Sequence, residues 1–323
     1  GTEHTELFLS ATDVKNIIPL IPTIYDEPFA DSSQIPTYLI SKLARHDVKV
    51  ALTGDGADEI LCGYNRYQVS QKLWGKFNRI PHCLRKIGSQ TISKIPAGTL
   101  NSIHSMLPVP NRSNNFSDRV FKGGRLLRAK NIDQFYLEFI SYWSDPEALV
   151  INSKEPKTIL NSNLEGIQDM SNMERMMYLD LLSYLPGDIL TKVDRASMAV
   201  SLETRLPFLD HRLIEFAWSL PNEYKYNNGQ SKWILKEVLN KYIPKKLYDR
   251  PKQGFGMPIN EWLKGSLKEW GEDLLNEQKI KEQGYFDAKQ VREKWSQHQS
   301  GKSNWQHQLW NVLMFQSWME ENK

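Results

Sequence analysis

The sequence predicts an α/β protein with a parallel sheet and a large helical C-terminal portion. Residues 5–52 read as strand, helix, loop, helix and strand, which is the order typical of a parallel sheet. An apolar run at residues 48–52, read as a buried strand, then stops at a loop with two glycines and three acidic residues. After residue 172, apolar residues recur mainly at helical spacing. Open α/β sheets bind ligands at the carboxyl ends of their strands, so the acidic loop is the first candidate for a site.

The first elements are predicted from short local patterns. Residues 6–10 read as a short strand with no capped element before it, so we expect the natural chain to begin upstream. Asp13 can cap a helix over residues 14–21, which the following proline ends. A polar, proline-bearing turn at residues 25–33 leads to a helix over residues 35–43, where apolar residues recur every four positions.

The middle of the chain and its C-terminal portion differ in pattern. From Tyr64 to about Asn172, basic residues are mixed with prolines, which favours a solvated basic face over a binding patch. Residues 173–182 are apolar almost all round, as a buried helix is. Further helices are expected over residues 189–198 after an interruption at Pro186-Gly187-Asp188, after the cap Asp210, and over residues 305–318.

Composition narrows the class of protein. The chain has 323 residues, a net charge of +3 and a pI of about 8.6, which is too mild to indicate a nucleic-acid-binding surface. No apolar stretch approaches the ~20 residues of a membrane span, so we expect neither a nucleic-acid nor a membrane partner. Two cysteines form no disulfide framework, which favours the cytoplasm. Cys62 follows the acidic loop directly, and a buried apolar role is favoured over that of a nucleophile.

The acidic loop carries the strongest chemical signal. Gly54 and Gly56 allow close approach of a ligand or a positive φ. Asp55, Asp58 and Glu59 could hold a hard cation or move protons. The alternative is a turn whose acidic residues only cap the next helix. Three acids in five residues favour the functional interpretation.

Two more segments could complete a site. The first is a charged helix in which Asp188, Thr191, Asp194 and Arg195 fall within about one face, followed by Glu203 in the next segment. Buried charges persist when they are paired or meet a ligand, and structural ion pairs remain an alternative of similar weight. The second is the loop at residues 250–258, where two glycines and two prolines surround Lys252.

The Lys252 loop could hold an ammonium group over developing negative charge. Taken alone, it would be assigned as a surface turn. The turn at residues 26–33, with its Pro and an Asp or Ser cap, would likewise be assigned no further role on its own.

Taken together, these segments resemble the synthetase domain of the glutamine-hydrolysing asparagine synthetase family. Asp26 to Pro36 is similar to its D-E-P-x-x-D-S-S stretch, and Leu52 to Tyr67 to its S-G-D-G-x-D-E-x-x-x-G-Y-x-R-Y segment. Leu185 to Asp210 is similar to its L-P-x-D-x-L-x-K-x-D-R-x-S-M-x-x-S-L-E-x-R-x-P-F-L-D signature. Arg250 to Pro258 is similar to its R-x-K-x-G-F-x-x-P loop. The resemblance covers nearly the whole chain and implies an adenine nucleotide alpha hydrolase-like, or ATP-pyrophosphatase, fold.

The resemblance also implies a two-step reaction and a role for each matching residue. ATP and a carboxylate form an acyl-adenylate, and ammonia then displaces AMP to give an amide, most simply asparagine from aspartate. Asp55 is implied in adenylate formation, Asp58 in binding Mg²⁺, and Lys252 in stabilising the transition state. The other residues carried over are the nucleotide contacts Thr53, Gly54 and Gly56, and the substrate-pocket candidates Asp194, Arg195 and Glu203.

The sequence departs from the family pattern in ways that bear on activity. Position 53 is Thr instead of the usual Ser, which keeps a hydroxyl group. The pyrophosphate-binding loop S-G-G-x-D-S and the glutaminase domain are absent from the sequence, and Gly1 aligns inside the synthetase domain. Residues 1–323 are therefore expected to be one partial synthetase domain, truncated at its start, whose second Mg²⁺ carboxylate lies upstream.

Three functions stay open at this point. The first is synthesis of asparagine, with ammonia from an upstream glutaminase domain of the same polypeptide and a homodimer as a possible assembly. The second is a sibling amidotransferase that acts on another carboxylate, such as a uronic acid in polysaccharide synthesis. The third, for the isolated chain, is an inactive fragment that binds only a nucleotide or a partner.

Overall fold

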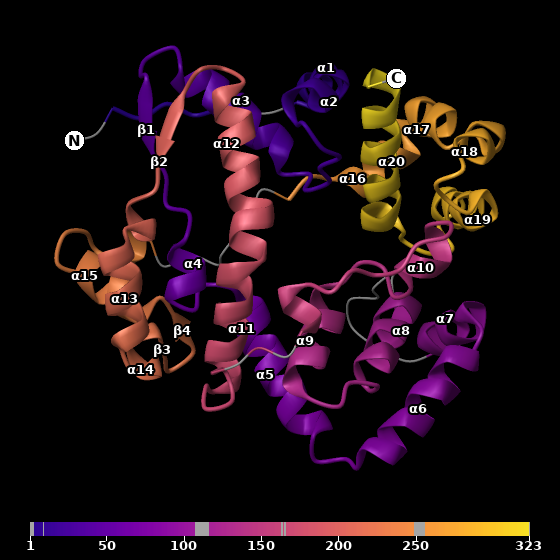
Figure 1. Ribbon diagram of the computed structural model, residues 1–323, viewed down its shortest axis with the longest axis horizontal. Helices are drawn as coiled ribbons and strands as arrows, with labels where there is room; N and C mark the ends of the chain where they lie inside the picture. Colours follow the sequence, from indigo (N-terminus) through magenta and orange to yellow (C-terminus); the bar gives the residue numbers. More distant parts are fainter. Residues whose placement is uncertain are drawn as a thin grey trace. The chain divides into compact units, whose positions relative to one another are not determined.

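The structure is a computed structural model that describes residues 3–8, 10–106, 116–162, 164, 166–248 and 256–322. These residues form a mostly helical protein with two small sheets (Figure 1). The chain divides into two compact units, residues 1–26, 31–71 and 163–257 and residues 27–30, 72–162 and 258–323. Across the described ranges, no helix combines the length and the apolar character needed to cross a bilayer.

The first unit holds both sheets. Its elements up to residue 77 are α1 (Ala11–Ile17), η1 (Ile18–Leu20), α2 (Ile21–Ile24), α3 (Gln34–Ala44), β1 (Val50–Leu52), α4 (Ala57–Ile60) and the start of α5 (Asn65–Phe77). Its later elements are α11 (Asn172–Leu182), η3 (Leu185–Leu190), α12 (Thr191–Met198), β2 (Glu203–Arg205), η4 (Pro207–Leu209), α13 (His211–Ser219), α14 (Asn222–Lys225), β3 (Tyr226–Asn227), β4 (Gln230–Ser231), α15 (Trp233–Leu239) and η5 (Lys245–Leu247).

The second unit is helical. Its elements are α6 (His82–Lys94), α7 (Ala97–Met106), α8 (Phe116–Leu126), α9 (Ile132–Ile140), α10 (Pro146–Leu149), η2 (Ile159–Asn161), α16 (Ile259–Lys264), α17 (Lys268–Leu274), α18 (Glu277–Gln283), α19 (Ala288–Gln299) and α20 (Gln306–Glu321). One of its cores packs Trp74 against Phe135, with Leu126 and Ile132 buried beside them. The predicted C-terminal helix is thus confirmed as α20.

The parallel sheet is confirmed, but it is small. β1 pairs with β2 in parallel, with Val50 opposite Glu203 and Leu52 opposite Arg205. The expectation of a buried strand is wrong, because Val50 and Leu52 are exposed, Leu52 to 73%. Apolar strands are buried on both faces only where other elements cover them, and β1 has β2 as its single strand neighbour among the described residues.

Two predictions about the N-terminal segment are also wrong. Residues 6–8 and Ser10 form no strand, and Leu9 lies outside the described residues. Ser10, not Asp13, caps α1: Asp13 donates its N–H to Ser10 and completes a capping box. The helix ends at Ile17, and the following Pro22 lies in the first turn of α2, where its missing N–H costs nothing.

The interruption predicted at Pro186 takes an unexpected form. The chain does not break there: α11, η3 and α12 continue one another as a single column (Figure 1). η3 is a π-helix whose first turn contains Pro186. Proline removes one helical hydrogen bond, and the wider π turn keeps the column unbroken while it shifts which residues face inward. This shift determines where the charged residues of α12 lie.

The helix after Asp210 is confirmed as α13, and the Asp210 side chain accepts a hydrogen bond from the Arg212 N–H. The helix expected over residues 35–43 is confirmed as α3. The helix expected over residues 173–182 is confirmed as α11, although Leu182 is exposed, so that α11 is not buried all round.

Gly56 is required by the backbone at the start of α4. Its φ is +90°, and an added Cβ would lie 2.3 Å from Cδ2 of Leu209. We therefore expect Gly56→Ala to lower the free energy of unfolding by about 2–3 kcal/mol, through left-handed strain and displacement of Leu209. Urea denaturation measures this change. Gly54→Ala is the matched control, because no atom lies within 4 Å of its added Cβ, and a similar loss there would contradict the explanation.

Candidate functional site

The loop after β1 has the features expected of a ligand-binding turn. The Thr53 N–H donates to the Arg205 carbonyl at 2.9 Å, which extends the parallel pairing by one residue. The Thr53 hydroxyl that follows is buried and has no hydrogen-bond partner among the described residues. Asp55 is half-buried and Gly54 has open space around it. A buried hydroxyl without a partner costs free energy unless a ligand or water satisfies it, so this loop suits a polar ligand.

Asp58 has a cationic partner that the sequence did not reveal. Lys232 Nζ lies 3.1 Å from Asp58 Oδ1, and both side chains are about three-quarters buried. Lys232 takes a left-handed φ of +53° just before α15, and its N–H donates to the Leu61 carbonyl at 3.1 Å. Gly63 makes room for the pair, since a Cβ there would lie 1.9 Å from Asp58 Oδ1. The left-handed backbone of Lys232 and the space that Gly63 leaves for Asp58 indicate that the fold holds this ion pair in a fixed position.

Asp58 is also the residue that the resemblance implies as a ligand of Mg²⁺. The described residues contain no group of three or more His, Cys, Asp or Glu side chains that could hold a metal ion. Mg²⁺ is usually bound by one or two carboxylates together with substrate phosphates, so Asp58 fits as a single protein ligand. On its own it makes no closed metal site.

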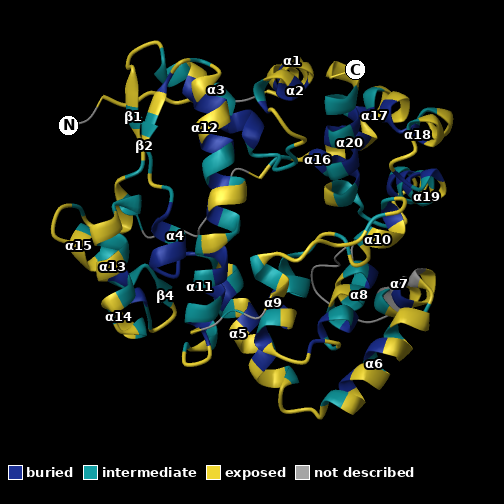
Figure 2. Ribbon diagram, in the orientation of Figure 1, coloured by how far each residue is buried: buried dark blue, intermediate teal, exposed yellow. Residues whose placement is uncertain are grey.

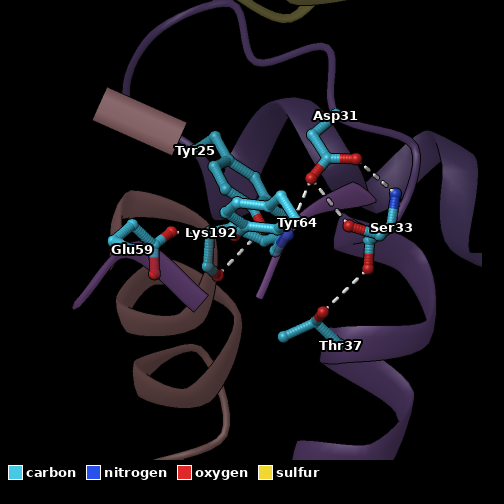
Figure 3. A network of polar contacts seen from close by, with 7 residues as sticks. All are labelled: Tyr25, Asp31, Ser33, Thr37, Glu59, Tyr64 and Lys192. Atoms are coloured by element: carbon cyan, nitrogen blue, oxygen red, sulfur yellow. Dashed lines mark hydrogen bonds and ion pairs between the residues drawn. The ribbon is translucent and has the colours of Figure 1, made fainter. Parts of the chain in front are cut away.

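Glu59 has a different role from the one expected of the acidic loop. Its side chain is buried, and Oε1 accepts a hydrogen bond from the Tyr64 hydroxyl at 2.8 Å (Figure 3). Burial raises its pKa above the usual value, against the effect of that hydrogen bond. The helix-cap alternative is not confirmed either, because Gly56 occupies the N-cap of α4 and no side chain bonds there. The loop thus leaves Asp55 and Asp58 partly accessible, Asp58 in an ion pair with Lys232, and buries Glu59.

A stacked arginine, Arg66, lies over the ring of Tyr64, the hydrogen-bond partner of Glu59. The Arg66 guanidinium lies 4.2 Å from the Tyr64 ring centroid and 4.3 Å from that of Tyr184. Its Nη2 donates to Asp180 Oδ2 at 2.6 Å, and the Tyr67 hydroxyl donates to the same oxygen at 2.6 Å. Asp180 is fully buried, so the pair is anchored inside the unit. Such a buried, hydrogen-bonded pair holds the two tyrosine rings in a fixed position.

A second set of carboxylates lies beside Tyr184. Lys192 Nζ donates to Asp31 Oδ2 at 2.7 Å, and Asp31 also accepts hydrogen bonds from the N–H and hydroxyl of Ser33 (Figure 3). The Tyr25 hydroxyl donates to the Lys192 carbonyl at 3.2 Å. Burial opposes ionisation of Asp31, but Lys192 and Ser33 outweigh it and lower its pKa.

Asp188 is the neighbour of this ion pair. Burial and the negative charge of Asp31 raise its pKa to about 7, and Lys192 only partly opposes them. Its Oδ1 is buried and has no hydrogen-bond partner within the part of the chain that the structure describes. Carboxyl groups with a pKa near neutrality, paired with an ionised neighbour, are typical of catalytic acids and bases.

The charged face predicted for residues 188–195 is split by the π turn. Asp188 faces inward and Lys192 is buried, whereas Asp194 and Arg195 are exposed. Asp194 and Arg195 border a cavity of about 410 Å³, which Thr204 and Leu209 also line. Arg195 Nη2 pairs with Asp26 at 2.9 Å.

Glu203 is separate from that cavity. It is exposed on the other face of β2 and pairs with Arg205 Nε at 2.7 Å. The structure therefore brings Asp194 and Arg195 to one cavity and leaves Glu203 outside it. Lys252 lies outside the described residues, so its expected position near Asp58 stays a prediction.

The sequence analysis predicted no role in the site for four residues of this region: Lys232, Asp31, Lys192 and Tyr64. Asp31 and Lys192 lie 161 positions apart, so no local pattern could pair them. A weak signal was present in the segments themselves, since both residues stand at fixed positions of the D-E-P-x-x-D-S-S and L-x-K-x-D-R patterns.

Cys62 is confirmed as a buried residue. Its thiol is fully buried, and burial raises its pKa to about 12. Cys83 is exposed. We expect one thiol per chain to react within minutes with a disulfide reagent at pH 8, and the second only after denaturation, because thiolate is the reactive form. Rapid reaction of the remaining thiol, Cys62, in the native Cys83→Ser variant would contradict this.

Comparison with known proteins agrees with this geometry. The asparagine synthase family model matches residues 1–320. Asparagine synthetase (glutamine-hydrolyzing) 1 of Bacillus subtilis (strain 168) is 30% identical over 100% of this chain and 48% of its own length. Human asparagine synthetase (glutamine-hydrolyzing) is 33% identical over 37% of this chain and 24% of its own.

A third relative has a different name. Amidase chyE of Penicillium rubens (strain ATCC 28089 / DSM 1075 / NRRL 1951 / Wisconsin 54-1255) is 22% identical over 76% of this chain and 38% of its own length. The chain spans about half the length of the Bacillus relative that it matches from end to end. On the family match over residues 1–320, the chain belongs to the asparagine synthase family.

Proposed function

We propose that the protein of which this chain is part makes an amide from a carboxylate and ammonia at the expense of ATP. The carboxylate oxygen attacks the α-phosphorus of ATP, which forms the acyl-adenylate and releases pyrophosphate. Ammonia then forms the C–N bond, and the C–O bond to AMP breaks. The observation that carries the proposal is the loop of Thr53 to Asp58, which joins the family pattern to an unsatisfied hydroxyl at the end of a parallel strand.

The loop residues would share the first step. Thr53, Gly54 and Gly56 would contact the nucleotide, and Asp55 would take part in adenylate formation. Asp58 would hold Mg²⁺, which when bound neutralises charge on the pyrophosphate. Lys252 would place its ammonium group over the charge that develops in the transition state. Asp194, Arg195 and Glu203 are proposed to shape the acceptor pocket. Asp194 and Arg195 line the cavity of about 410 Å³, whereas Glu203 pairs with Arg205 outside it.

The second step needs a proton acceptor, because attack by ammonia leaves a positive charge on nitrogen. Asp188 is suited to this task, since its pKa of about 7 allows it to be ionised near neutrality and to take up a proton. Lys192 and Asp31 would keep it in place. Tyr184 would link this pair to the loop, because its ring packs edge-on against that of Tyr64. Burial raises the pKa of its hydroxyl, which is close enough to Asp188 and Asp31 for their charges to raise that pKa further.

Aspartate is the acceptor that we propose, with asparagine as product. A different carboxylate, such as a uronic acid, is the second candidate, since one relative of this chain is named an amidase and not an asparagine synthetase. A glutaminase domain of the same polypeptide would supply the ammonia, as the half-length match to the glutamine-hydrolysing relatives suggests. A homodimer and a cytoplasmic location are further parts of the proposal.

The acceptor is tested with the full-length protein, ATP, Mg²⁺ and ammonium chloride. We expect AMP release to depend on aspartate and asparagine to form in equal amount. AMP release that is independent of aspartate, but dependent on glucuronate, would replace the first candidate by the second. The isolated 323-residue chain is expected to be inactive, because the sequence lacks the pyrophosphate loop.

A further inference from the structure

The positive charge of this chain is concentrated in one segment. Residues 72–130 hold twelve Lys and Arg residues but a single acidic residue, Asp118. The whole chain has 41 basic and 38 acidic residues. Its net charge of +3 therefore conceals the excess of positive charge in this segment. The expectation of no nucleic-acid partner depended on that average, and the expectation of no membrane partner depended on the lack of a spanning segment. A charge asymmetry of this kind indicates an anionic partner.

Most of these cations are exposed in the second unit. The exposed ones among the described residues are Lys72, Lys76, Arg79, Lys86, Lys94, Arg119, Lys122, Arg128 and Lys130. Lys86 and Lys94 form no ion pair with a carboxylate in the part of the chain that the structure describes. The charges of these two lysines are therefore not neutralised by a carboxylate among the described residues.

The exposed face of α6 combines these cations with large apolar side chains. Leu84 and Ile87 are 56% and 59% exposed, and Ile80 just before the helix is 43% exposed. Lys86 and Lys94 of α6 are exposed as well. A shallow cavity of about 400 Å³ opens there, lined by Ile87, Gln90, Thr91, Lys94, Ile95 and Pro96. Figure 2 shows exposed residues along the outer side of this helix.

The opposite face of α6 is firmly attached to the unit. Arg85 is buried, and its Nη1 donates to the Ala129 carbonyl at 2.7 Å. Arg128 Nε donates to the hydroxyl of buried Ser89 at 2.8 Å. These bonds set which side of α6 faces outward, so the apolar side chains are exposed by a fixed orientation of the helix.

We propose that the exposed face of α6, with Ile80, Leu84, Ile87, Lys86 and Lys94, docks on an anionic phospholipid surface. Leu84 and Ile87 would enter the headgroup region while the lysines contact lipid phosphates. Helices with a basic polar face and exposed large aliphatic residues bind membranes in this way. Docking needs no spanning helix, and it is independent of the proposed reaction.

Nucleic acid is the other polyanion that such a charge could attract. Phosphate-binding surfaces are predominantly polar and charged, and they gain nothing from exposed Leu and Ile side chains. The three aliphatic residues on one face, next to an open cavity, therefore favour lipid. The two partners also differ in the test, because replacing aliphatic residues by Ser should weaken only the binding of lipid.

Cys83 gives a direct probe of this face, because it lies on α6 and is exposed while Cys62 is buried. The full-length protein is labelled at Cys83 with an environment-sensitive fluorophore and mixed with vesicles of phosphatidylcholine, with or without 30% phosphatidylglycerol. We expect a blue shift and co-sedimentation with the phosphatidylglycerol vesicles only, both weakened by salt. Equal binding to both vesicles, or to neither, would overturn the proposal.

Two pairs of substitutions locate the surface. Lys86→Glu with Lys94→Glu should lower the vesicle partition coefficient about tenfold or more. Leu84→Ser with Ile87→Ser should lower it several-fold even at low salt. Lys268→Glu with Lys289→Glu, exposed cations of α17 and α19 in the same unit, is the matched control and should leave it unchanged. Binding of a labelled DNA duplex that survives the Ser variant, without vesicle binding, would assign the face to nucleic acid instead.

Discussion

Asp58→Asn is expected to lower the rate of ATP–pyrophosphate exchange in the full-length protein about a hundredfold or more. The substitution removes the carboxylate proposed to bind Mg²⁺, and it leaves Lys232 partly buried without its counter-charge at 3.1 Å. Losing one group that stabilises transition-state charge typically costs ~3–4 kcal/mol, which corresponds to this change in rate. The exchange assay with aspartate and saturating Mg²⁺ measures it.

The control for Asp58→Asn is Asp273→Asn. Asp273 also pairs with a lysine, Lys279 at 3.4 Å, but it is 76% exposed and lies in the other unit. Exposed ion pairs contribute little, so we expect unchanged exchange and a change in unfolding free energy below ~0.5 kcal/mol. Equal exchange rates in the two variants would show that Asp58 has no part in the adenylation step.

Asp188→Asn is expected to act on the second step alone. Adenylation should continue, whereas formation of the amide from ammonia should fall about a hundredfold, in the range typical of a lost general base. In the unmodified protein, the rate of the ammonia-dependent step should rise with pH up to about 7, where Asp188 ionises. The variant should lose that dependence. Rapid-quench separation of adenylate from amide distinguishes the steps.

Although Asp188→Asn should lower activity, it is expected to raise the free energy of unfolding above pH 7. Because the folded pKa of Asp188 lies above its ordinary value of 3.8, the native state binds the proton more tightly, and its stability falls as the pH rises from about 4 to about 7. Asp188→Asn should therefore match the unmodified protein near pH 4 and be more stable above pH 7. We expect ~2 kcal/mol, less than the ~4 kcal/mol of three pKa units, because Asp188 titrates together with Asp31.

Urea denaturation at pH 5 and pH 8 measures this difference. Asp169→Asn, an exposed residue of the same unit, is the matched control and should be neutral at both values. A variant Asp188→Asn that is destabilised at pH 8 would contradict the assignment of a raised pKa.

Much of the fold follows from local patterns. The four-residue spacing over residues 35–43 and the cap at Asp210 lead directly to α3 and α13, because periodicity and capping are local interactions. The burial of β1 could not be read in this way, because an apolar strand is buried only if other elements cover both of its faces. The π turn at Pro186 could not be predicted from the sequence either, because packing decides whether a proline ends a helix or is accommodated in a wider π turn.

In the candidate site, too, the contiguous loop could be predicted from the sequence, whereas contacts between distant segments could not. The loop of Thr53 to Asp58 is one contiguous segment, and its glycine spacing indicated a positive φ that Gly56 adopts. The partners Lys232 and Asp31 come from distant segments, so the pairings with Asp58 and Lys192 exist only in three dimensions. The prediction that the charged residues of 188–195 share one helical face was wrong, because the π turn rotates Asp188 inward and leaves Asp194 exposed.

The central claim is that a nucleotide meets the carboxylates which follow β1. Isotope exchange between pyrophosphate and ATP in the full-length protein, with aspartate but without ammonia, tests it most directly, because this exchange reports the adenylate alone. We predict exchange that requires aspartate and is lost in Asp58→Asn and Asp55→Asn but kept in Asp273→Asn. Undiminished exchange in both loop variants would contradict the account.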